Sequence, residues 1–449
     1  MLARRMKSFV AGACLIVLSG TLVACSGGTK ASENPAVAGN AGKDAPAIRS
    51  EATKAPTELT VYYMFAGTDY DSFMQNYGNY IQSKYPNFTF KYITTGKGTT
   101  LEEMVATKTD MDLIITTSGN IPKLQDFGLT YDIAALATKY KFDLNRFEPT
   151  TLSLLRNSSG GAVVGLPFRI NTLGLFYNRD LFNKFAVPYL RDGMTWDQIY
   201  DVAKLMTRQE SGIQYYGFLM RPIANNLVLS SYSQSVVDPK THQATLDNDR
   251  WKTIFQNYLR FYEIPGYNTN PDLMTSAKPF DLFTKEQTLA IFSQGNSDYP
   301  KSGVTVNWDT VTYPADKSLP GTGPQPQPVY FLIPSSSKHK DEAFLSLEVL
   351  TSDEVQMSKS KQGSPTVLKS QPIRDAYGSE APELKGRNAK ALNPATYAEA
   401  VPVDAYSGQA NTPLANAFIS VASGSKDMNT ALRKANEEAN KGIAALLGK

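Results

Sequence analysis

Residues 163–182, with the sequence VVGLPFRINTLGLFYNRDLF, carry the pattern that decides the fold of this chain. The stretch predicts two extended runs that lead into a helix. A second helix follows, because Thr-Trp-Asp-Gln at 195–198 forms a capping box and places Trp196 in the first turn. Extended runs that alternate with helices indicate an α/β protein.

Upstream of this stretch, strand and helix patterns alternate. Three strands are expected, at 59–65, 88–93 and 111–116. A helix is expected at 71–85, and a second begins after Thr100, because Thr100 and Glu103 form a capping box. The order strand, helix, strand, helix, strand predicts a parallel sheet with helices packed on it.

Downstream, the pattern is mixed. Helices are expected at 250–262, 280–288, 340–350, 352–361 and from about 411 onward. A short strand is expected at 289–292, and the proline-rich segment 303–334 is expected to be mostly extended. The sequence has no internal repeat. Its 449 residues are long for one domain and suit two.

The first 24 residues predict a secretory signal peptide. Arg4, Arg5 and Lys7 precede an apolar run at 9–18 that is too short to span a bilayer. The Leu-Val-Ala-Cys sequence that ends at Cys25 resembles a bacterial lipobox, which implies cleavage before Cys25 and a diacylglycerol on its sulfur. An ordinary signal peptide with an incidental cysteine is the alternative. A multiply acylated cysteine would anchor the protein stably to the outer face of the cell membrane.

A flexible linker is expected after the lipidated cysteine, over residues 25–56. This segment is rich in Gly, Ala, Ser, Thr and Pro and has few large apolar side chains, so it buries little surface. Beyond the signal peptide, no apolar segment approaches the roughly 20 residues of a membrane helix. The sequence therefore predicts an anchored protein that does not span the membrane.

Composition excludes several classes of function. With cleavage before Cys25, 425 residues remain, and basic and acidic residues balance at 42 each. Nucleic-acid binding requires a basic face, and the sequence contains no such cluster. Cys14 leaves with the signal, so the folded body has no free thiol or disulfide. Its two histidines, His242 and His339, make Ser-His catalysis and histidine-rich metal sites hard to build. We expect no metal and no cofactor.

Several motifs, in order, resemble the bacterial extracellular solute-binding proteins of family 1, the receptors of ABC importers. The central match is Gly-Leu-Pro-Phe at 165–168, Leu-Phe-Tyr-Asn-Arg-Asp-Leu-Phe at 175–182 and Thr-Trp-Asp at 195–197. Further similar segments are 111–117, 283–292, 333–343 and the Gly-x-x-Pro-like loop 362–365. Within 283–292 the chain departs from the family, because Lys-Glu-Gln at 285–287 replaces the usual Gly-Lys.

The resemblance implies a two-lobe fold like that of type II periplasmic binding proteins. Two α/β lobes would be joined by three crossings, with the ligand cleft between them. Lobe one would comprise 57–168 plus 306–357, and lobe two 169–305 plus 358–449. Loops at the carboxyl ends of parallel strands are also the places where α/β sheets bind ligands.

Aromatic and polar side chains near these strand ends are the candidate ligand contacts, because rings stack on sugar C–H faces and carboxylates or amides bind hydroxyls. The candidates are Phe65, Asp69, Tyr70, Ser118, Arg169, Asn171, Arg221, Tyr232, Asn296, Asp298, Tyr299, Trp308 and Ser364, with Asn225 and Asn226 beside them. Trp196 and Trp251 are expected to be structural.

Several candidates also have a structural interpretation. Asp69 would cap the following helix, with Tyr70 packed on it, and Ser118 would be a helix cap. Arg169 would form a salt bridge between the lobes. The loop 294–299 would be solvated.

The sequence favours a monomeric, non-enzymatic receptor that binds a small solute, a carbohydrate by class, for the transmembrane subunits of an ABC importer. One alternative is a surface enzyme that cleaves carbohydrate with a carboxylate pair, since the chain has 42 acidic residues. Another is a signalling or adhesion lipoprotein that no longer serves transport.

Overall fold

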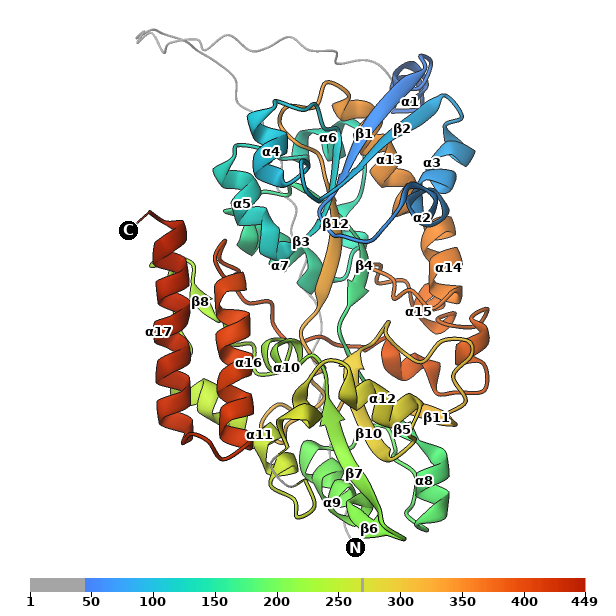
Figure 1. Ribbon diagram of the computed structural model, residues 1–449. Helices are drawn as coiled ribbons and strands as arrows, with labels where there is room; N and C mark the ends of the chain where they lie inside the picture. The colour runs from blue at the N-terminus through green and yellow to red at the C-terminus, as the bar shows by residue number, and fades with distance from the viewer. Residues whose placement is uncertain (1–44, 268–269, 449) are drawn as a thin grey trace, which may run out of the picture. The chain divides into compact units, whose positions relative to one another are not determined.

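Two mixed β-sheets organise the described part of the chain, residues 45–267 and 270–448, in this computed structural model (Figure 1). The first sheet has the order β2-β1-β3-β12-β4, with β1 (Thr57–Tyr63), β2 (Phe88–Thr94), β3 (Leu113–Thr117), β4 (Gly165–Asn171) and β12 (Gln327–Leu332). β1 pairs in parallel with β2 and β3, because helices return the chain to the same end of the sheet. This confirms the expected strand–helix alternation.

Helices precede, connect and follow the strands of the first sheet. They are α1 (Ala45–Ala52), α2 (Tyr70–Phe73), α3 (Asn79–Lys84), α4 (Leu101–Ala106), α5 (Ile121–Asp126), α6 (Ala134–Lys139), α7 (Pro149–Ser158), α13 (Lys340–Leu350), α14 (Asp353–Lys361) and α15 (Gln371–Asp375), with the 3₁₀ turns η2 (Ser118–Asn120) and η3 (Leu144–Arg146). The capping box of Thr100 and Glu103 is present.

The expected continuous helix at 71–85 is interrupted by a π-helical turn, η1 (Met74–Gly78). Gly78 lies against the Met74 side chain, and a Cβ there would come within 2.3 Å of the Met74 sulfur. Only glycine therefore fits this position as it stands.

The second sheet has the order β11-β5-β10-β7-β6. Its strands are β5 (Leu173–Asn178), β6 (Arg208–Glu210), β7 (Ile213–Met220), β10 (Leu289–Gly295) and β11 (Trp308–Val311). Its helices are α8 (Arg179–Lys184), α9 (Trp196–Met206), α10 (Ile223–Val228), α11 (Asp249–Tyr262), α12 (Lys278–Thr284), α16 (Gly408–Ala422) and α17 (Met428–Leu446), with 3₁₀ turns η4 (Pro271–Met274), η5 (Pro382–Leu384) and η6 (Ala389–Leu392). β8 (Val237–Asp238) and β9 (Gln243–Ala244) form a small hairpin.

Each sheet has its own hydrophobic core. In the second core, the Trp196 ring packs edge-on against Phe218, Tyr258, Phe261 and Tyr313, at centroid distances of 5.1–5.9 Å. Trp251 is also fully buried there. The structural roles expected for both tryptophans are confirmed, and the two cores account for the two lobes of the expected type II fold.

The chain passes between the two cores three times. The first crossing lies at Thr172, which alone separates β4 from β5, whereas the expected boundary between 168 and 169 falls within β4. The other two differ from the expected division at 306 and 358. β11 pairs with β5 in the second sheet, and Val367, Leu368 and Ile373 are buried in the first core. Strand pairing and side-chain burial decide these boundaries, and neither is local in sequence.

The expected linker is ordered at its end, where residues 45–52 form α1. Arg49 anchors this helix through an ion pair with Glu348 (Nη2 to Oε1, 2.6 Å) and a hydrogen bond to the carbonyl of Tyr140 (2.6 Å). One arginine with two partners thus orders a segment whose composition predicts flexibility. The predicted signal peptide and Cys25 lie outside the described residues.

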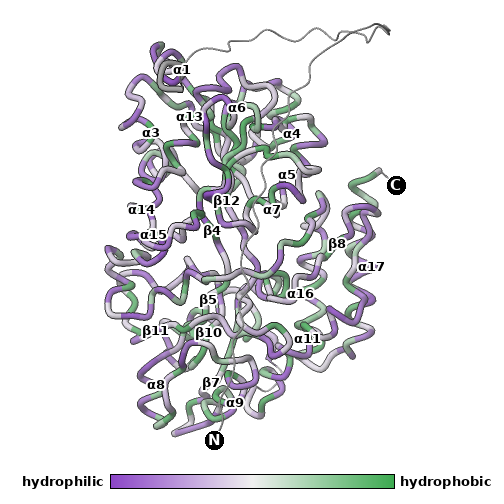
Figure 2. Tube along the Cα trace, turned by 180° about the vertical axis from the view of Figure 1, so that it is seen from behind, coloured by the Kyte–Doolittle hydropathy of each residue, from purple (hydrophilic) through white to green (hydrophobic). Residues whose placement is uncertain are grey.

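Helices α16 and α17 pack against each other at the end of the chain. Hydrophobic and hydrophilic colours alternate along α17 in Figure 2 because buried residues recur every four positions, at Ala431, Ala435, Ala439 and Ile443. Its polar residues divide into two groups: Asn436 and Asn440 accept hydrogen bonds from the N–H groups of Leu246 and Ala244, whereas the charged side chains of α17 are exposed. Of the helices within 45–448 that are described, none is both long and apolar enough to cross a membrane.

Replacing Trp196 by alanine should lower the free energy of unfolding by about 3–5 kcal/mol, because the indole is 2 % exposed and a cavity would remain. Leu205→Ala on the same helix is the matched control, since Leu205 is 57 % exposed and its loss should cost less than about 0.5 kcal/mol. Urea denaturation measures both, and equal effects would contradict this account of the second core.

Candidate ligand-binding site

Asn296 holds the first crossing through its buried side-chain amide and through its backbone N–H, which donates to the Thr172 carbonyl (2.9 Å). The Asn296 Oδ1 accepts a hydrogen bond from the Thr172 backbone N–H (3.0 Å), and its Nδ2 donates to the Leu392 carbonyl (2.9 Å). The Thr172 hydroxyl donates to the Gln325 carbonyl (2.9 Å). Asn296 therefore ties the first crossing to the end of β10 and to η6, while Thr172 ties it to the second crossing.

A cavity of about 290 Å³, the crossover cavity, opens beside this junction. Its lining is polar and comes from both sheets: Arg169, Asn171, Thr172, Leu173, Asn225, Leu229, Gly295, Asn296, Ser297, Asp298 and Gln327. The two charged members come from opposite sheets, because Arg169 lies on β4 and Asp298 follows β10.

A second cavity of about 300 Å³, the loop cavity, shares Leu229 and Gln327 with the crossover cavity. On the side of the first sheet it is lined by residues 117–120 and Leu154. On the side of the second it is lined by α10, α16, residues 234–236 and 401–403, Ala405 and Ser407. None of its lining residues is charged, and many present hydroxyl or amide groups. Together the two cavities offer hydrogen-bonding groups from both halves of the protein.

The two cavities lie where an α/β fold is expected to bind a ligand. Thr117 ends β3 and Gly295 ends β10, so the cavities open at the carboxyl ends of these strands. Their volumes are at the lower end of the range typical of small-molecule sites.

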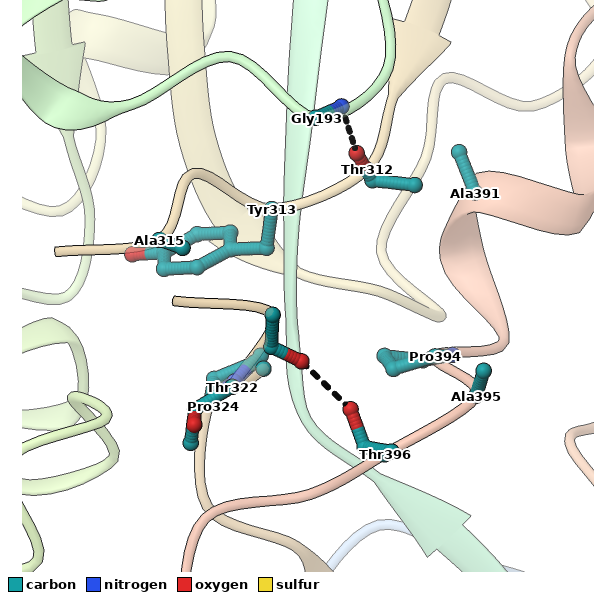
Figure 3. A pocket seen from close by; sticks show the side chains of 12 residues that line it. Gly193, Thr312, Tyr313, Ala315, Thr322, Pro324, Ala391, Pro394, Ala395 and Thr396 are labelled. Atoms are coloured by element: carbon teal, nitrogen blue, oxygen red, sulfur yellow. Dashed lines mark hydrogen bonds between the residues drawn. The ribbon is translucent and has the colours of Figure 1, made fainter. Parts of the chain in front are cut away.

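A third cavity, of about 250 Å³, contains no residue from the strands of the first sheet (Figure 3). Its walls are mainly glycine, alanine, proline and threonine. Hydrogen bonds from the Gly193 N–H to the Thr312 hydroxyl (2.8 Å) and from the Thr396 hydroxyl to the Gly321 carbonyl (2.6 Å) hold its loops. A ligand in it would contact only one sheet, so we place the candidate site in the other two cavities.

Five of the predicted site residues line these two cavities. Ser118 lines the loop cavity, and Arg169, Asn171, Asn296 and Asp298 line the crossover cavity. The others line neither: Phe65, Asp69, Tyr70, Arg221, Tyr232, Tyr299, Trp308 and Ser364.

Tyr299 and Trp308 use their ring faces within the protein. They stack on each other at 6.0 Å with an interplanar angle of 28°, and both are almost fully buried. The Arg387 guanidinium lies 4.1 Å from the Trp308 ring centroid, and the Lys301 ammonium lies 3.3 Å from that of Tyr299. Packing in the second core accounts for both rings.

Arg221 and Tyr232 also have internal partners. The Arg221 Nε donates to Gln294 Oε1 (3.0 Å) and its Nη1 to the Ser276 carbonyl (3.0 Å). The hydroxyl of Tyr232 donates to Asp316, and burial raises the pKa of Tyr232. Ser364 is half-buried, and its N–H donates to the Lys359 carbonyl (3.0 Å).

The loop after β1 combines a helix cap with accessible rings. The Asp69 carboxylate accepts from the Ser72 N–H (2.8 Å), which lowers the pKa of Asp69 and matches the capping alternative. Tyr70 is 44 % exposed, and the partly exposed Phe65 ring packs edge-on against Tyr63 (5.2 Å). This loop follows β1 and the loop of Ser118 follows β3, and the two strands are parallel neighbours.

Sequence reasoning missed Gln327, which lines both cavities. Its only signal is a position at the start of an apolar run in the proline-rich segment, which does not distinguish it from Gln325. Asn225 and Asn226 have different environments in the structure. Asn225 lines the crossover cavity, whereas Asn226 is fully buried and donates to the carbonyls of Arg221 and Pro222.

Two β-sheets with their helices are joined by three crossings of the chain, and polar cavities lie at the junction. This arrangement defines a binding protein of the two-lobed type II class. The profile of the bacterial extracellular solute-binding protein family matches residues 66–357, and the chain belongs to this family.

Solved structures share this fold across nearly their whole length. A sugar transporter protein from Rhizobium etli in an open conformation is 20% identical, with a TM-score of 0.67, and covers 87% of this chain and 99% of its own. The sugar-binding protein MalE from Xanthomonas citri is 15% identical, with a TM-score of 0.67, and covers 87% of this chain and 98% of its own. An ABC substrate-binding protein from Listeria monocytogenes in complex with cycloalternan is 16% identical, with a TM-score of 0.65, and covers 86% of this chain and 99% of its own. No curated protein sequence matches the chain.

Asn296→Ala should destabilise the protein by about 1–3 kcal/mol for each of the two buried backbone groups that lose their partner, the Thr172 N–H and the Leu392 carbonyl. The neighbouring Ser297→Ala is the control and should change the free energy of unfolding by less than about 0.5 kcal/mol. Denaturant unfolding of both variants tests this, and a neutral Asn296→Ala would show that the amide does not hold the crossing.

Proposed function

We propose that this protein is a lipid-anchored extracellular receptor that binds a carbohydrate between its two lobes and delivers it to the membrane subunits of an ABC importer. The observation that carries the proposal is the pair of adjoining cavities, which present hydroxyl and amide groups from both sheets and meet at Leu229 and Gln327. Hydroxyls and amides are both donors and acceptors, which suits the hydroxyl groups of a sugar.

Family membership and the related structures support a carbohydrate as the ligand class. Two of the related proteins are a sugar transporter protein and a sugar-binding protein, and a third is in complex with cycloalternan. A ligand that contacts both lobes stabilises their closed arrangement by its higher affinity for that state. The importer would then recognise closure, and the receptor would act as a monomer.

A binding role accounts for the lining better than catalysis does. A glycosidase requires two facing carboxylates, and Asp298 is the only carboxylate among the lining residues of the two cavities. We therefore propose that the protein does not alter its ligand chemically.

Calorimetric titration of the purified full-length protein with a panel of neutral and acidic oligosaccharides should give saturable heat without product. Micromolar affinity corresponds to about −8 kcal/mol, and excess ligand should raise the melting temperature. Gln327→Ala should weaken binding about tenfold, because Gln327 lines both cavities. The exposed Gln209→Ala on β6 should leave affinity unchanged.

Two results would redirect this proposal. Release of reducing sugar would identify an enzyme, and the absence of any saccharide ligand would favour a signalling or adhesion lipoprotein.

Replacing Cys25 by alanine should release the protein from the membrane fraction and abolish labelling with radioactive palmitate, because the acyl chains supply the anchoring free energy. Cys14→Ala is the control, since Cys14 lies within the predicted signal peptide. Membrane retention of the Cys25 variant would rule out the lipid anchor.

A further inference from the structure

Arg169 brings an unpaired positive charge to the crossover cavity. It lies on β4, the edge strand of the first sheet, and lines the cavity. Its Nε is buried without a hydrogen-bond partner, and its guanidinium has no ion pair with any residue described in 45–267 and 270–448. The interlobe salt bridge expected as the alternative role of Arg169 is thus absent among these residues.

Lys359 carries a second positive charge on α14, the helix that contacts the strand of Arg169. Its side chain, in the last turn of α14, is 8 % exposed. The ammonium donates to the Asn76 Oδ1 (3.3 Å) and lies 5.1 Å from the centroid of the Tyr80 ring, but within the described chain no carboxylate lies within 4.0 Å of it. Both of its close partners are uncharged side chains, so its charge is not neutralised.

Arg169 and Lys359 lie on elements that contact each other, since Gln356 of α14 donates to the carbonyl of Phe168 on β4 (3.0 Å). Burial lowers the pKa of Lys359, and the positive charge of Arg169 lowers it further, although Tyr80 opposes both effects. Arg169 also acts on Tyr77, whose pKa burial raises to about 12 against the effect of the guanidinium. We call Arg169 and Lys359 the cation pair.

The protein holds the cation pair in place from several sides. On α14, Gln356 Nε2 donates to the carbonyl of Phe168 (3.0 Å), next to Arg169. The N–H of Ile170 donates to the Pro365 carbonyl (3.4 Å), and the ring of Phe168 packs edge-on against Tyr77 (4.9 Å). These contacts fix the helix of Lys359 against the strand of Arg169, so neither charge can easily move away from the other.

A bound anion would neutralise the positive charge of the cation pair. Two like charges in a partly desolvated place disfavour each other, and a bound anion removes that cost. Guanidinium groups match the paired oxygens of carboxylates and phosphates. Other half-buried cations have partners of their own: Arg49 pairs with Glu348 and Arg260 with Asp197. Arg221, which has no ion pair among the described residues, donates to Gln294 and to the Ser276 carbonyl.

The one acidic residue of the crossover cavity does not neutralise the cation pair. Asp298 is exposed and belongs to the other sheet. Its charge acts on Arg221 and Lys301, where burial lowers both pKa values and Asp298 offsets part of that shift. Its influence is thus shared with cations on its own side of the cavity.

We propose that the solute is an anionic carbohydrate, which carries a carboxylate or a phosphate that Arg169 binds, with Lys359 adding positive charge from the neighbouring helix. This rests on the proposed function and names the substrate class of the same site. The hydroxyl and amide groups of the loop cavity would bind the uncharged part of the same ligand.

Calorimetry of the full-length protein with galactobiose, digalacturonate and glucose 6-phosphate tests this. Digalacturonate or glucose 6-phosphate should bind about 10- to 100-fold more tightly than galactobiose, because a charge-assisted hydrogen bond is added. The preference should shrink as salt is raised. Which of the two anions binds more tightly identifies the anionic group.

Variants assign the preference to the cation pair. Arg169→Gln should reduce it to less than about threefold, whereas Lys359→Gln should weaken it less, because Lys359 does not line the cavity. Arg169→Lys keeps the charge and should retain part of the preference. The control is Lys361→Gln on the same helix, where Lys361 pairs with Glu380 (2.9 Å) on the surface and its loss should leave the preference unchanged.

Melting curves confirm that each variant is folded before its affinity is interpreted. Equal binding of neutral and anionic sugars, or a preference that survives in folded Arg169→Gln, would overturn the inference while the receptor function stands. Failure of every saccharide to bind would overturn the proposed function and this inference with it.

Discussion

The architecture depends on how the chain crosses from one sheet to the other, and the amide of Asn296 controls the first crossing. Both ends of this amide are used, one by the Thr172 N–H and one by the Leu392 carbonyl. Because the side chain is fully buried, water cannot replace either partner. The crossover cavity is built around this fixed point, so its polar lining is positioned by the same contacts that join the two halves.

Local signals predicted most of the fold. The capping boxes at Thr100 and Thr195, and the two extended runs around Thr172, appear in the structure where the sequence places them. The later boundaries could not be predicted in the same way. The pairing of β11 with β5 and the burial of Val367 depend on partners far away in the chain, and no periodicity reports them.

The candidate site was predicted less completely, for a related reason. A polar residue after a strand is easy to recognise, and Ser118, Arg169 and Asp298 do line the cavities. An aromatic residue in the same kind of loop is ambiguous, because it can stack on a sugar or on another ring. Trp308 and Tyr299 stack on each other, and only their three-dimensional neighbours reveal this. Gln327 illustrates the opposite case of a lining residue without a sequence signal.

Because Thr172 alone joins β4 to β5, insertions and deletions at this point are restricted during evolution. β4 and β5 belong to different sheets, and only Thr172 separates them. One inserted residue at 172 would displace Thr172 from Asn296, which bonds to its N–H and its carbonyl, and from the Gln325 carbonyl, which accepts from its hydroxyl. Substitutions of the other residues that line the cavities leave this crossing intact, whereas insertions and deletions at residue 172 disrupt it.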